Sequence, residues 1–332
     1  MSPDSATLSP HMRAAVILGL GCSPQELKPF QAEHNSERNI EWRMGMPGSG
    51  DEADVILIFG GDGTIHRHLG QLVRLGLPVL VVPVGSGNDF ARALGLRRVR
   101  DSVAAWRRFC RGDARSNRTR GDDPGNHVRS IDLGLITPLT PLESAGELPA
   151  PHGPRYFCCV AGVGLDGEVS RRANRLPRWL RGHGGYVGSL VPTIFSFAPL
   201  RVKILAAAVN SGADNEGSES WIARSDRPTI LAAFANTPVY GGGMKIAPRA
   251  KMDDGLLDVC VVGAVDRMRL LRLFPTVYSG DHLSVPEVQY FQAGRVRVET
   301  EYPLDVYADG EYVCRTPVEV GAQSAVLKVI TP

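Results

Sequence analysis

The chain has 332 residues, of which 43% are hydrophobic and 22% are charged, and its formal net charge is +2. This length is sufficient for one large or two ordinary domains with substantial hydrophobic cores. The small net charge does not indicate nucleic-acid binding. No segment approaches the roughly 18–20 consecutive apolar residues of a membrane-spanning helix, and the first residues lack the pattern of a signal peptide. The sequence therefore predicts a cytoplasmic globular protein with no transmembrane segment and no nucleic-acid partner.

The six cysteines form no C-x-x-C pair; they are Cys22, Cys110, Cys158, Cys159, Cys260 and Cys314. Among them, only Cys158 and Cys159 are neighbours in the sequence. This spacing is typical of reduced thiols in a cytoplasm rather than of a disulfide framework or a zinc site.

A first buried strand is predicted at Ala14–Leu20 and a second at Val55–Phe59, where five apolar residues precede a glycine turn. The turn, G-G-D-G-T, is made of Gly60, Gly61, Asp62, Gly63 and Thr64. It leads into an apolar-periodic helix for which Thr64 is the predicted N-cap. A strand, a glycine turn and a helix N-terminus together form an anion site, because free N–H groups and the helix dipole favour negative charge. Asp62 inside this turn indicates either a cation between carboxylate and phosphate or a helix cap, and both interpretations stay open.

The same pattern follows again less than thirty residues later. A buried strand is predicted at Leu77–Val84 and a short helix ends at Gly95. Between them lies a second polar glycine turn, made of Gly85, Ser86, Gly87, Asn88 and Asp89. Two successive strand–turn–helix units indicate a doubly wound α/β sheet, in which ligands bind beyond the carboxyl ends of the strands. The sequence therefore predicts a phosphate and metal site over the two turns.

A basic helix is predicted at Arg97–Arg111, and a strand at Ser130–Ile136 contains Asp132. A Pro-rich segment follows, and beyond it most of the chain consists of short apolar runs separated by turn residues, which is typical of a β-sandwich-like domain. Asn210–Arg227, rich in Gly, Ser, Asp and Glu, is predicted to be a loop. The predicted division is an α/β nucleotide-binding domain at 1–135 and a β-rich substrate domain at 136–332, with the last residues able to return to the first domain.

One glycine motif in the second domain is misleading. Gly162–Gly167 matches G-x-G-x-x-G after a strand, but a dinucleotide-binding fold also needs an acidic residue about 20 positions further on. None occurs between Glu168 and Asp214. The sequence therefore does not predict a Rossmann cofactor site.

Together, the two glycine turns carry a family resemblance. Gly60–Thr64, followed by P-V-G-S-G-N-D-F-A-R at Pro83–Arg92, resembles the diacylglycerol kinase catalytic-domain family of lipid kinases. Further segments match along nearly the whole chain, at Val160–Val169, Tyr240–Val259, Ser279–Leu283 and Asp309–Glu311. The resemblance implies a first domain like those of NAD kinases and phosphofructokinases, joined to a β-sandwich-like domain.

The resemblance also implies a reaction, the transfer of the γ-phosphoryl group of ATP to a lipid hydroxyl, with diacylglycerol as the default acceptor. ATP and Mg²⁺ would be the cofactors, the lipid would be met at a membrane surface by peripheral association, and a homodimer is allowed. Every residue of both glycine turns, and Asp132, would contact the nucleotide and its Mg²⁺. Asp309 would be the general base with Glu311 assisting, and a structural Mg²⁺ would bind the Asp254 carboxylate and the carbonyls of Lys251 and Leu256.

The residues themselves leave simpler interpretations open. Asp132 could face solvent from an edge strand, and Asp309 with Gly310 is by pattern a hairpin turn. Lys251–Leu256 is equally compatible with a plain D-G turn. The arginine-rich segment Arg171–Arg181, which contains a tryptophan, suits either an anionic membrane surface or a solvated helix face.

The chain also departs from the family at three places. It has G-C-S-P at Gly21–Pro24 instead of an N-P-x-S-G turn, His66 and Arg67 instead of Asn and Glu, and Cys159 instead of Asn. These departures concern nucleotide contact rather than the fold. They make a catalytically silent protein that binds lipid or nucleotide one alternative. An NAD kinase is the other, because NAD kinases share the first glycine motif.

Overall fold

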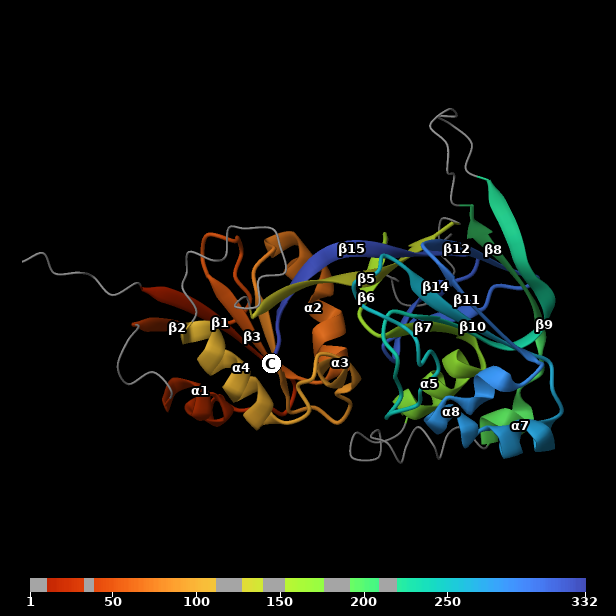
Figure 1. Cartoon of the computed structure of the whole chain (residues 1–332), viewed down its shortest axis with the longest axis horizontal. Coiled ribbons are helices and arrows are strands. Elements are labelled where there is room, and N and C mark those ends of the chain that lie inside the picture. The colour runs from red at the N-terminus through yellow and green to blue at the C-terminus, as the bar shows by residue number, and fades with distance from the viewer. Residues whose placement is uncertain (1–10, 33–38, 112–126, 140–152, 176–191, 209–219) are drawn as a thin grey trace, which may run out of the picture. The chain divides into compact units, whose positions relative to one another are not determined.

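The computed structural model describes the chain except for residues 1–10, 33–38, 112–126, 140–152, 176–191 and 209–219 (Figure 1). The chain forms two compact units, each described here by itself. Unit 1 comprises Met1–Ile131 and Val326–Pro332, and unit 2 comprises Asp132–Ala325. The division predicted from sequence lies a few residues further along the chain, at 135/136.

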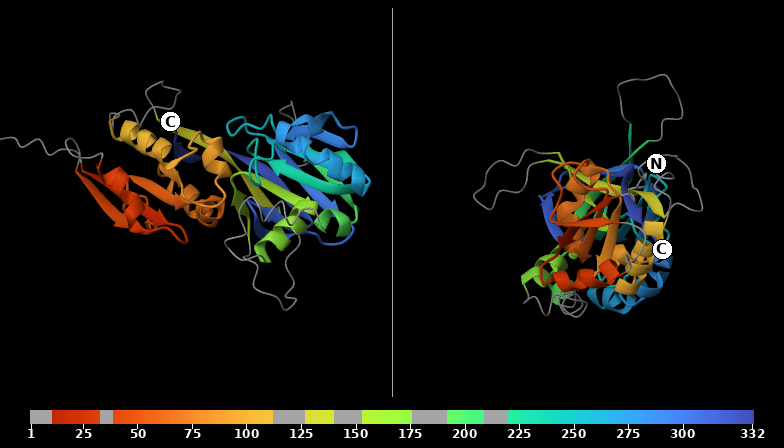
Figure 2. Two further views of the ribbon diagram at one scale, coloured as in Figure 1. Left: turned by 90° about the horizontal axis from the view of Figure 1, so that it is seen from below. Right: turned by 90° about the vertical axis from the view of Figure 1, so that its left-hand side faces the viewer.

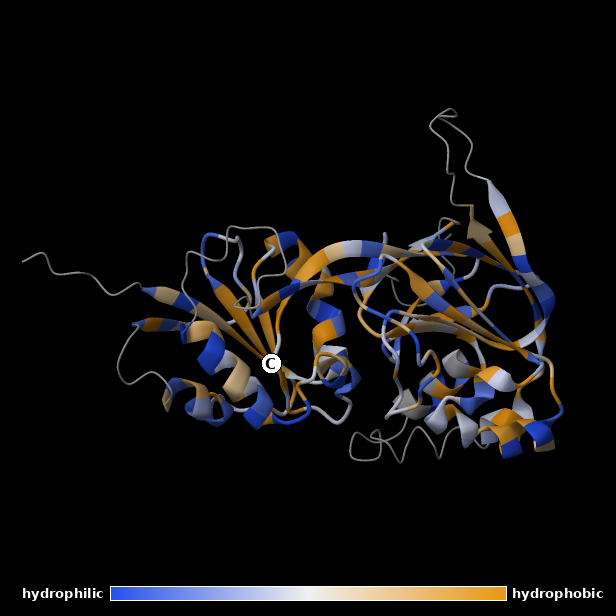
Figure 3. Ribbon diagram, viewed as in Figure 1, coloured by the Kyte–Doolittle hydropathy of each residue, from blue (hydrophilic) through white to orange (hydrophobic). Residues whose placement is uncertain are grey.

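Unit 1 contains a parallel sheet in the order β2-β1-β3-β4-β15. Its strands are β1 (Met12–Leu18), β2 (Ile40–Met44), β3 (Val55–Gly60), β4 (Val79–Pro83) and the end of β15 (Val318–Ile330). Every residue of β3 and β4 is buried, as their apolar runs predict (Figure 3). The order reverses between β1 and β3, and in doubly wound sheets ligands bind at such a point. The predicted α/β class is confirmed, whereas the short, half-polar β2 was not predicted.

The helices of unit 1 are α1 (Lys28–Ala32), α2 (Asp62–Leu75), α3 (Asp89–Ala93) and α4 (Val99–Arg111), with a 3₁₀ turn, η1, at Pro24–Leu27. Phe30 of α1 packs edge-on against Phe59 of β3, and their ring centroids are 5.3 Å apart. The N-cap of α2 is Gly61, so the prediction of Thr64 was wrong. Thr64 is buried in the first turn of the helix, because the chain enters helical geometry as soon as it leaves the glycine pair.

Unit 2 is built from antiparallel strands. They are β5 (Val128–Pro138), which begins in unit 1, β6 (Arg155–Phe157), β7 (Val160–Gly164), β8 (Leu200–Ala207), β9 (Trp221–Ala235), β10 (Leu257–Gly263), β11 (Val288–Ala293), β12 (Arg295–Thr300), β13 (Asp305–Ala308), β14 (Glu311–Arg315) and the first part of β15. The first half of β9 pairs with β8, and its second half pairs with both β7 and β10. A core of valines with Phe157, Phe234 and Phe291 fills the space between strands. The predicted β-sandwich-like class is confirmed.

The loop predicted at Asn210–Arg227 was wrong for its second part. Trp221–Arg227 forms the first half of β9 and pairs with β8. Most residues of this half are at least partly exposed, so it lacks the alternation of apolar and polar residues that identifies a half-buried strand. Residues 210–219 of the predicted loop lie outside the described residues.

Three helices lie on the same side of the unit 2 strands: α5 (Leu165–Arg175), α7 (Arg267–Leu273) and α8 (Thr276–Ser279) (Figures 1 and 2). In the chain, α8 is followed by a 3₁₀ turn, η4, at Asp281–Ser284. An apolar cluster joins α5 to α7 through Leu165, Val169, Leu270 and Phe274. In the part of the chain that the structure describes, no helix is both long and apolar enough to cross a bilayer.

Gly134 of β5 is a position where a single methyl group should destabilise unit 2. A Cβ added there would lie 2.0 Å from Cζ of Phe157, whose ring is fully buried. Gly134→Ala is therefore expected to cost about 1–3 kcal/mol, the usual cost of overpacking a core. Thermal unfolding measures this as a lower Tm. In the control Gly70→Ala, on the exposed side of α2, the added Cβ meets nothing within 4 Å and should leave the Tm unchanged or raise it.

Candidate active-site elements

The two predicted glycine turns lie in direct contact in unit 1. The first glycine loop, Gly60–Thr64, begins at the last residue of β3, and the second, Gly85–Asp89, comes after β4 and ends at the first residue of α3. The backbone N–H of Asp62 donates to the carbonyl of Gly87 at 3.0 Å. A Cβ on Gly61 would lie 2.2 Å from that same carbonyl oxygen, so only glycine permits this approach of the two backbones. The structure thus brings ten of the eleven residues predicted to contact nucleotide, all except Asp132, into two adjoining segments.

The first glycine loop is shorter than the sequence predicts, because α2 already begins at Asp62. Gly63 was predicted to be part of the turn and is instead a half-buried residue in the first turn of this helix. Its carbonyl accepts from Nε of Arg67 at 2.9 Å, so one of the residues that depart from the family braces the start of α2. The N–H groups of Asp62 and Thr64 already donate to the carbonyls of Gly87 and Gly61 at 3.0 and 2.9 Å, so an anion at this end of α2 would be met by the N–H of Gly63 and by the helix dipole. Contact between Gly63 and the nucleotide stays a prediction.

Asp62 joins the two loops through its side chain as well. Its Oδ2 accepts from the backbone N–H of Asp89 at 2.9 Å, and its Oδ1 accepts from Phe90 at 3.0 Å. These N–H groups begin α3, so Asp62 caps the helix of the neighbouring loop and not the helix in which it lies. This accounts for a carboxylate inside a turn suited to phosphate, because two amide dipoles already compensate part of its charge.

The second glycine loop is braced from within. The Asn88 side chain accepts from the N–H of Gly85 at 3.2 Å and donates to the Gly85 carbonyl at 2.7 Å. Asp89 is buried and forms an ion pair with Arg92 of α3. Ser86, between these anchors, is exposed. The loop is therefore held in shape while its outer residue stays accessible.

Asp132 is buried in unit 2, so the interpretation as a solvent-facing edge residue was wrong. Its Oδ2 accepts from the N–H of Gly255 and its Oδ1 from the N–H of Ala325, both at 2.7 Å. These bonds tie β5 to the Lys251–Leu256 turn and to the point where β15 bends, since Ala325 has a positive φ of 54°. Contact between Asp132 and the nucleotide stays a prediction.

The Lys251–Leu256 turn presents a set of oxygen donors. Gly255 has a φ of 72°, and Oδ1 of the exposed Asp254 accepts from the N–H of Leu256 at 3.1 Å. An exposed carboxylate beside backbone carbonyls is the chemistry that Mg²⁺ prefers, and Mg²⁺ usually keeps several waters. The predicted ligands therefore fit a hard cation, although its binding stays a prediction.

Asp309 lies at the tip of the β13–β14 hairpin. Asp309 and Gly310 have φ values of 51° and 83°, the conformation of a two-residue type I′ turn, so the predicted hairpin is confirmed. Three backbone N–H groups hold the half-buried carboxylate: Cys158 donates to Oδ2 at 2.9 Å, and Cys159 and Val160 donate to Oδ1 at 2.8 and 3.3 Å. Glu311, the first residue of β14, is exposed.

The backbone beneath Asp309 is positioned by Asn236, which the sequence analysis did not identify. Its Nδ2 donates to the carbonyls of Cys158 and Asp132 at 3.0 Å each, and its N–H donates to the carbonyl of Cys159 at 2.8 Å. Because Asp309 contacts the backbone of Cys159, the family departure at that side chain preserves this contact. A polar residue directly after the apolar end of β9 was the signal available in the sequence.

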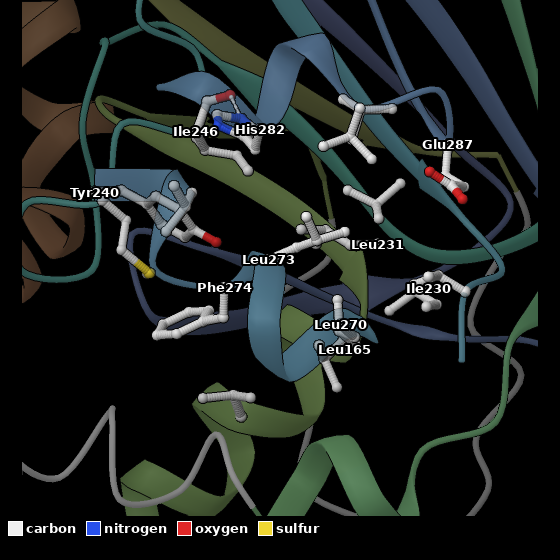
Figure 4. A pocket seen from close by; sticks show the side chains of 17 residues that line it. Leu165, Ile230, Leu231, Tyr240, Ile246, Leu270, Leu273, Phe274, His282 and Glu287 are labelled. Carbon is white, nitrogen blue, oxygen red and sulfur yellow. Dashed lines mark hydrogen bonds between the residues drawn. The ribbon is translucent and has the colours of Figure 1, made fainter. Parts of the chain in front are cut away.

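An apolar cavity of about 100 Å³ lies among α5, α7, α8 and β9 of unit 2 (Figure 4). Its lining includes Leu165, Val169, Leu270, Leu273 and Phe274. In the close-up, His282 and Glu287 lie at different ends of a largely apolar wall that also includes Tyr240 and Phe274. His282 bonds to the Ile246 carbonyl at 3.2 Å, and burial lowers its pKa, which favours the neutral imidazole. The sequence analysis missed this cavity because its residues come from separate segments.

The arginine-rich segment is described only in part. Arg171 and Arg172 of α5 form ion pairs with Glu168 at 2.7 and 3.0 Å, and the hydrogen bond from Arg171 lowers the pKa of Glu168. Both arginines are thus engaged, and Arg172 also donates to Oγ of Ser196 at 2.8 Å. Arg175 is the last residue of α5, whereas residues 176–191, with Arg178, Trp179 and Arg181, lie outside the described residues.

Known families match both units. Residues 34–119 match the diacylglycerol kinase catalytic domain, and residues 159–331 match the YegS C-terminal NAD kinase beta sandwich-like domain. A diacylglycerol kinase of Mycobacterium tuberculosis is 32% identical over 285 residues, covering 84% of this chain and 77% of that protein. The chain belongs to the diacylglycerol kinase family. A second member, a diacylglycerol kinase of Bacillus subtilis, is 27% identical over 270 residues, covering 81% of this chain and 74% of its own.

A solved structure supports the fold of this family member. The crystal structure of a putative diacylglycerol kinase from Bacillus anthracis has a TM-score of 0.62 at 19% identity, covering 97% of this chain and 98% of that one. Family membership confirms the resemblance found in the sequence and identifies the chain as a kinase.

Proposed function

We propose that this kinase transfers the γ-phosphoryl group of ATP to the hydroxyl group of a lipid, with diacylglycerol as the first acceptor to test. The pair of glycine loops in unit 1 carries the proposal. The backbones of the two loops lie in contact next to the N-terminus of the 14-residue helix α2. They offer backbone amides and a helix dipole to a polyphosphate. Mg²⁺ bound with ATP would neutralise phosphate charge during transfer.

Asp309 would act as general base. An alcohol that attacks phosphorus must lose its proton, and a carboxylate within hydrogen-bond reach can accept it. The three amides around Asp309 fix the carboxylate in one orientation, which suits a group that must meet a hydroxyl in a defined position. The exposed Glu311 would assist. A cation at Lys251–Leu256 would be structural, since Asp132 ties this turn to β5 and β15.

The apolar cavity favours a lipid acceptor. Largely apolar walls bind hydrocarbon by removing its surface from water and offer little to the polar ribose or pyrophosphate of NAD. This observation favours a lipid kinase over the alternative, an NAD kinase. A lipid substrate would be met at a membrane surface, so peripheral membrane association belongs to the proposal, and a homodimer stays a prediction.

The test is to incubate the full chain with γ-labelled ATP and Mg²⁺, in parallel with diacylglycerol-containing vesicles and with NAD. Label in the lipid fraction is the expected result. Label in NAD would show that the acceptor assignment is wrong. Label in neither, with ATP binding intact, would support the silent protein suggested by the departures at Gly21–Pro24, His66, Arg67 and Cys159.

A further inference from the structure

Two thiols lie against the Asp309 carboxylate within unit 2. Cys158 and Cys159 connect β6 to β7, and their Sγ atoms are 4.0 Å apart. Sγ of Cys158 is 3.4 Å from Oδ2 of Asp309, and the ligand atoms of all three residues lie within 4.8 Å of one another. Both cysteines are buried, and Asp309 is half-buried beside the exposed Gly310. Asp309 is therefore the one of the three residues that is partly exposed.

The two distances from Sγ of Cys158 are close to those between the ligands of a tetrahedral zinc ion. With Zn–S bonds of about 2.3 Å and Zn–O bonds of about 2.0–2.2 Å, tetrahedral ligands lie roughly 3.8 Å apart for two sulfurs and roughly 3.5 Å apart for sulfur and oxygen. The separations of 4.0 and 3.4 Å in the structure differ from these values by only a few tenths of an ångström. The backbone that carries the thiols is also fixed, because Asn236 binds the carbonyls of Cys158 and Cys159.

A disulfide between the two cysteines suits this geometry less well. Disulfide-bonded residues usually have Cα atoms about 4.4–6.8 Å apart. Adjacent residues joined by a trans peptide are held at about 3.8 Å. The structure therefore favours a shared ligand over a bond between the two sulfurs.

We propose that Cys158, Cys159 and Asp309 together bind one thiophilic divalent cation, Zn²⁺, with water as a fourth ligand. Two Zn–S bonds and one Zn–O bond form, and each thiol loses its proton to solvent, so no electrons are transferred. Cysteine spacing along the chain does not predict this site, because the third ligand comes from a hairpin distant in sequence. Where Asp309 also serves as the base, an inference that rests on the proposed function, bound Zn²⁺ would block proton acceptance and inhibit transfer.

Metal binding is tested without any activity measurement, on the full chain, with Co²⁺ as a spectroscopic substitute for Zn²⁺. Wild type should bind one Co²⁺ with the thiolate charge-transfer band and visible absorption of a tetrahedral cobalt thiolate site, and Zn²⁺ should displace it. Because binding releases thiol protons, affinity should rise with pH. Absence of these bands in the wild type would overturn the proposal.

Variants identify the ligands. Loss of a group that only supports a metal ligand lowers metal affinity roughly 10–100-fold. Cys158→Ser and Cys159→Ser should each lower it by more than this, and Asp309→Asn should also lower it. The matched control is Cys260→Ala, because burial raises the pKa of that thiol to about 12 and keeps it protonated. Circular dichroism without metal confirms folding, and the two serine variants test the site independently. Unchanged affinity in a folded serine variant, or full affinity in folded Asp309→Asn, would overturn the three-ligand site.

Discussion

Asp309→Asn is expected to lower the rate of phosphoryl transfer to lipid by roughly 10²–10⁴-fold, the usual contribution of a positioned general base. An amide cannot accept the proton of the attacking hydroxyl. ATP affinity should change much less, because Asp309 would act on the acceptor hydroxyl and is part of neither glycine loop proposed to bind the nucleotide. Turnover with vesicles and ATP binding by calorimetry measure the two effects separately.

The same substitution should also lower the stability of unit 2. The carboxylate accepts three backbone N–H groups through both of its oxygens. In asparagine an NH₂ group replaces one of the two oxygens. At least one of the three backbone N–H groups then faces this NH₂ group, which is also a donor, instead of an acceptor. Leaving a partly buried donor without an acceptor costs about 1–3 kcal/mol, which appears as a lower Tm. Turnover must therefore be measured below the Tm of both proteins.

Glu311→Gln is the matched control for this experiment. It removes the same kind of charge two residues away, at an exposed position, and should lower turnover much less and leave the Tm near that of the wild type. Near-normal turnover in a folded Asp309→Asn protein would contradict the assignment of the base. A similar loss in both variants would instead indicate that the charge of the hairpin, and not a proton acceptor, supports the reaction.

What the sequence predicts well in this protein is local. The glycine loops at Gly60–Thr64 and Gly85–Asp89 are contiguous motifs at the ends of fully buried strands, and the D-G turn at Asp309 needs only two residues in a left-handed conformation. Both the α/β class and the β-sandwich-like class follow from the order of such segments. The exact start of α2 was less predictable, because Gly63 has a low helix propensity and yet lies within its first turn.

The sequence does not predict features that form where segments distant in the chain meet. Asp132 is satisfied by Gly255 and Ala325, so its burial could not be distinguished from an exposed edge position without the fold. Asn236 and the apolar cavity likewise gather residues from separate strands and helices. The capping of α3 by Asp62 is a further case. The sequence indicated a cap for the helix that contains Asp62, whereas the structure has Asp62 capping the helix of the second glycine loop.

Asp62→Ala is expected to weaken ATP binding at least tenfold. Asp62 supplies both acceptors for the N–H groups of Asp89 and Phe90, residues that are nearly or fully buried. Each N–H group left without an acceptor destabilises the folded protein by about 1–3 kcal/mol. The second glycine loop can relieve this cost by moving away from the first, which lets its N–H groups find other partners. The amides of the two loops would then no longer converge on one polyphosphate. Calorimetry with ATP and Mg²⁺, together with the Tm, measures the result.

Asp62→Asn refines this experiment because its remaining oxygen can satisfy one of the two N–H groups, so its ATP affinity should lie between those of Asp62→Ala and the wild type. Asp101→Asn is the control. Asp101 accepts from the N–H of Arg98 at the start of α4, which is not one of the helices that follow the two glycine loops. This substitution should therefore leave ATP affinity unchanged. A folded Asp62→Ala protein that binds ATP as tightly as the wild type would show that the contact between the loops is not needed for nucleotide binding. The graded loss from Asn to Ala would instead show that the geometry of this contact, and not the charge of Asp62 alone, shapes the phosphate site.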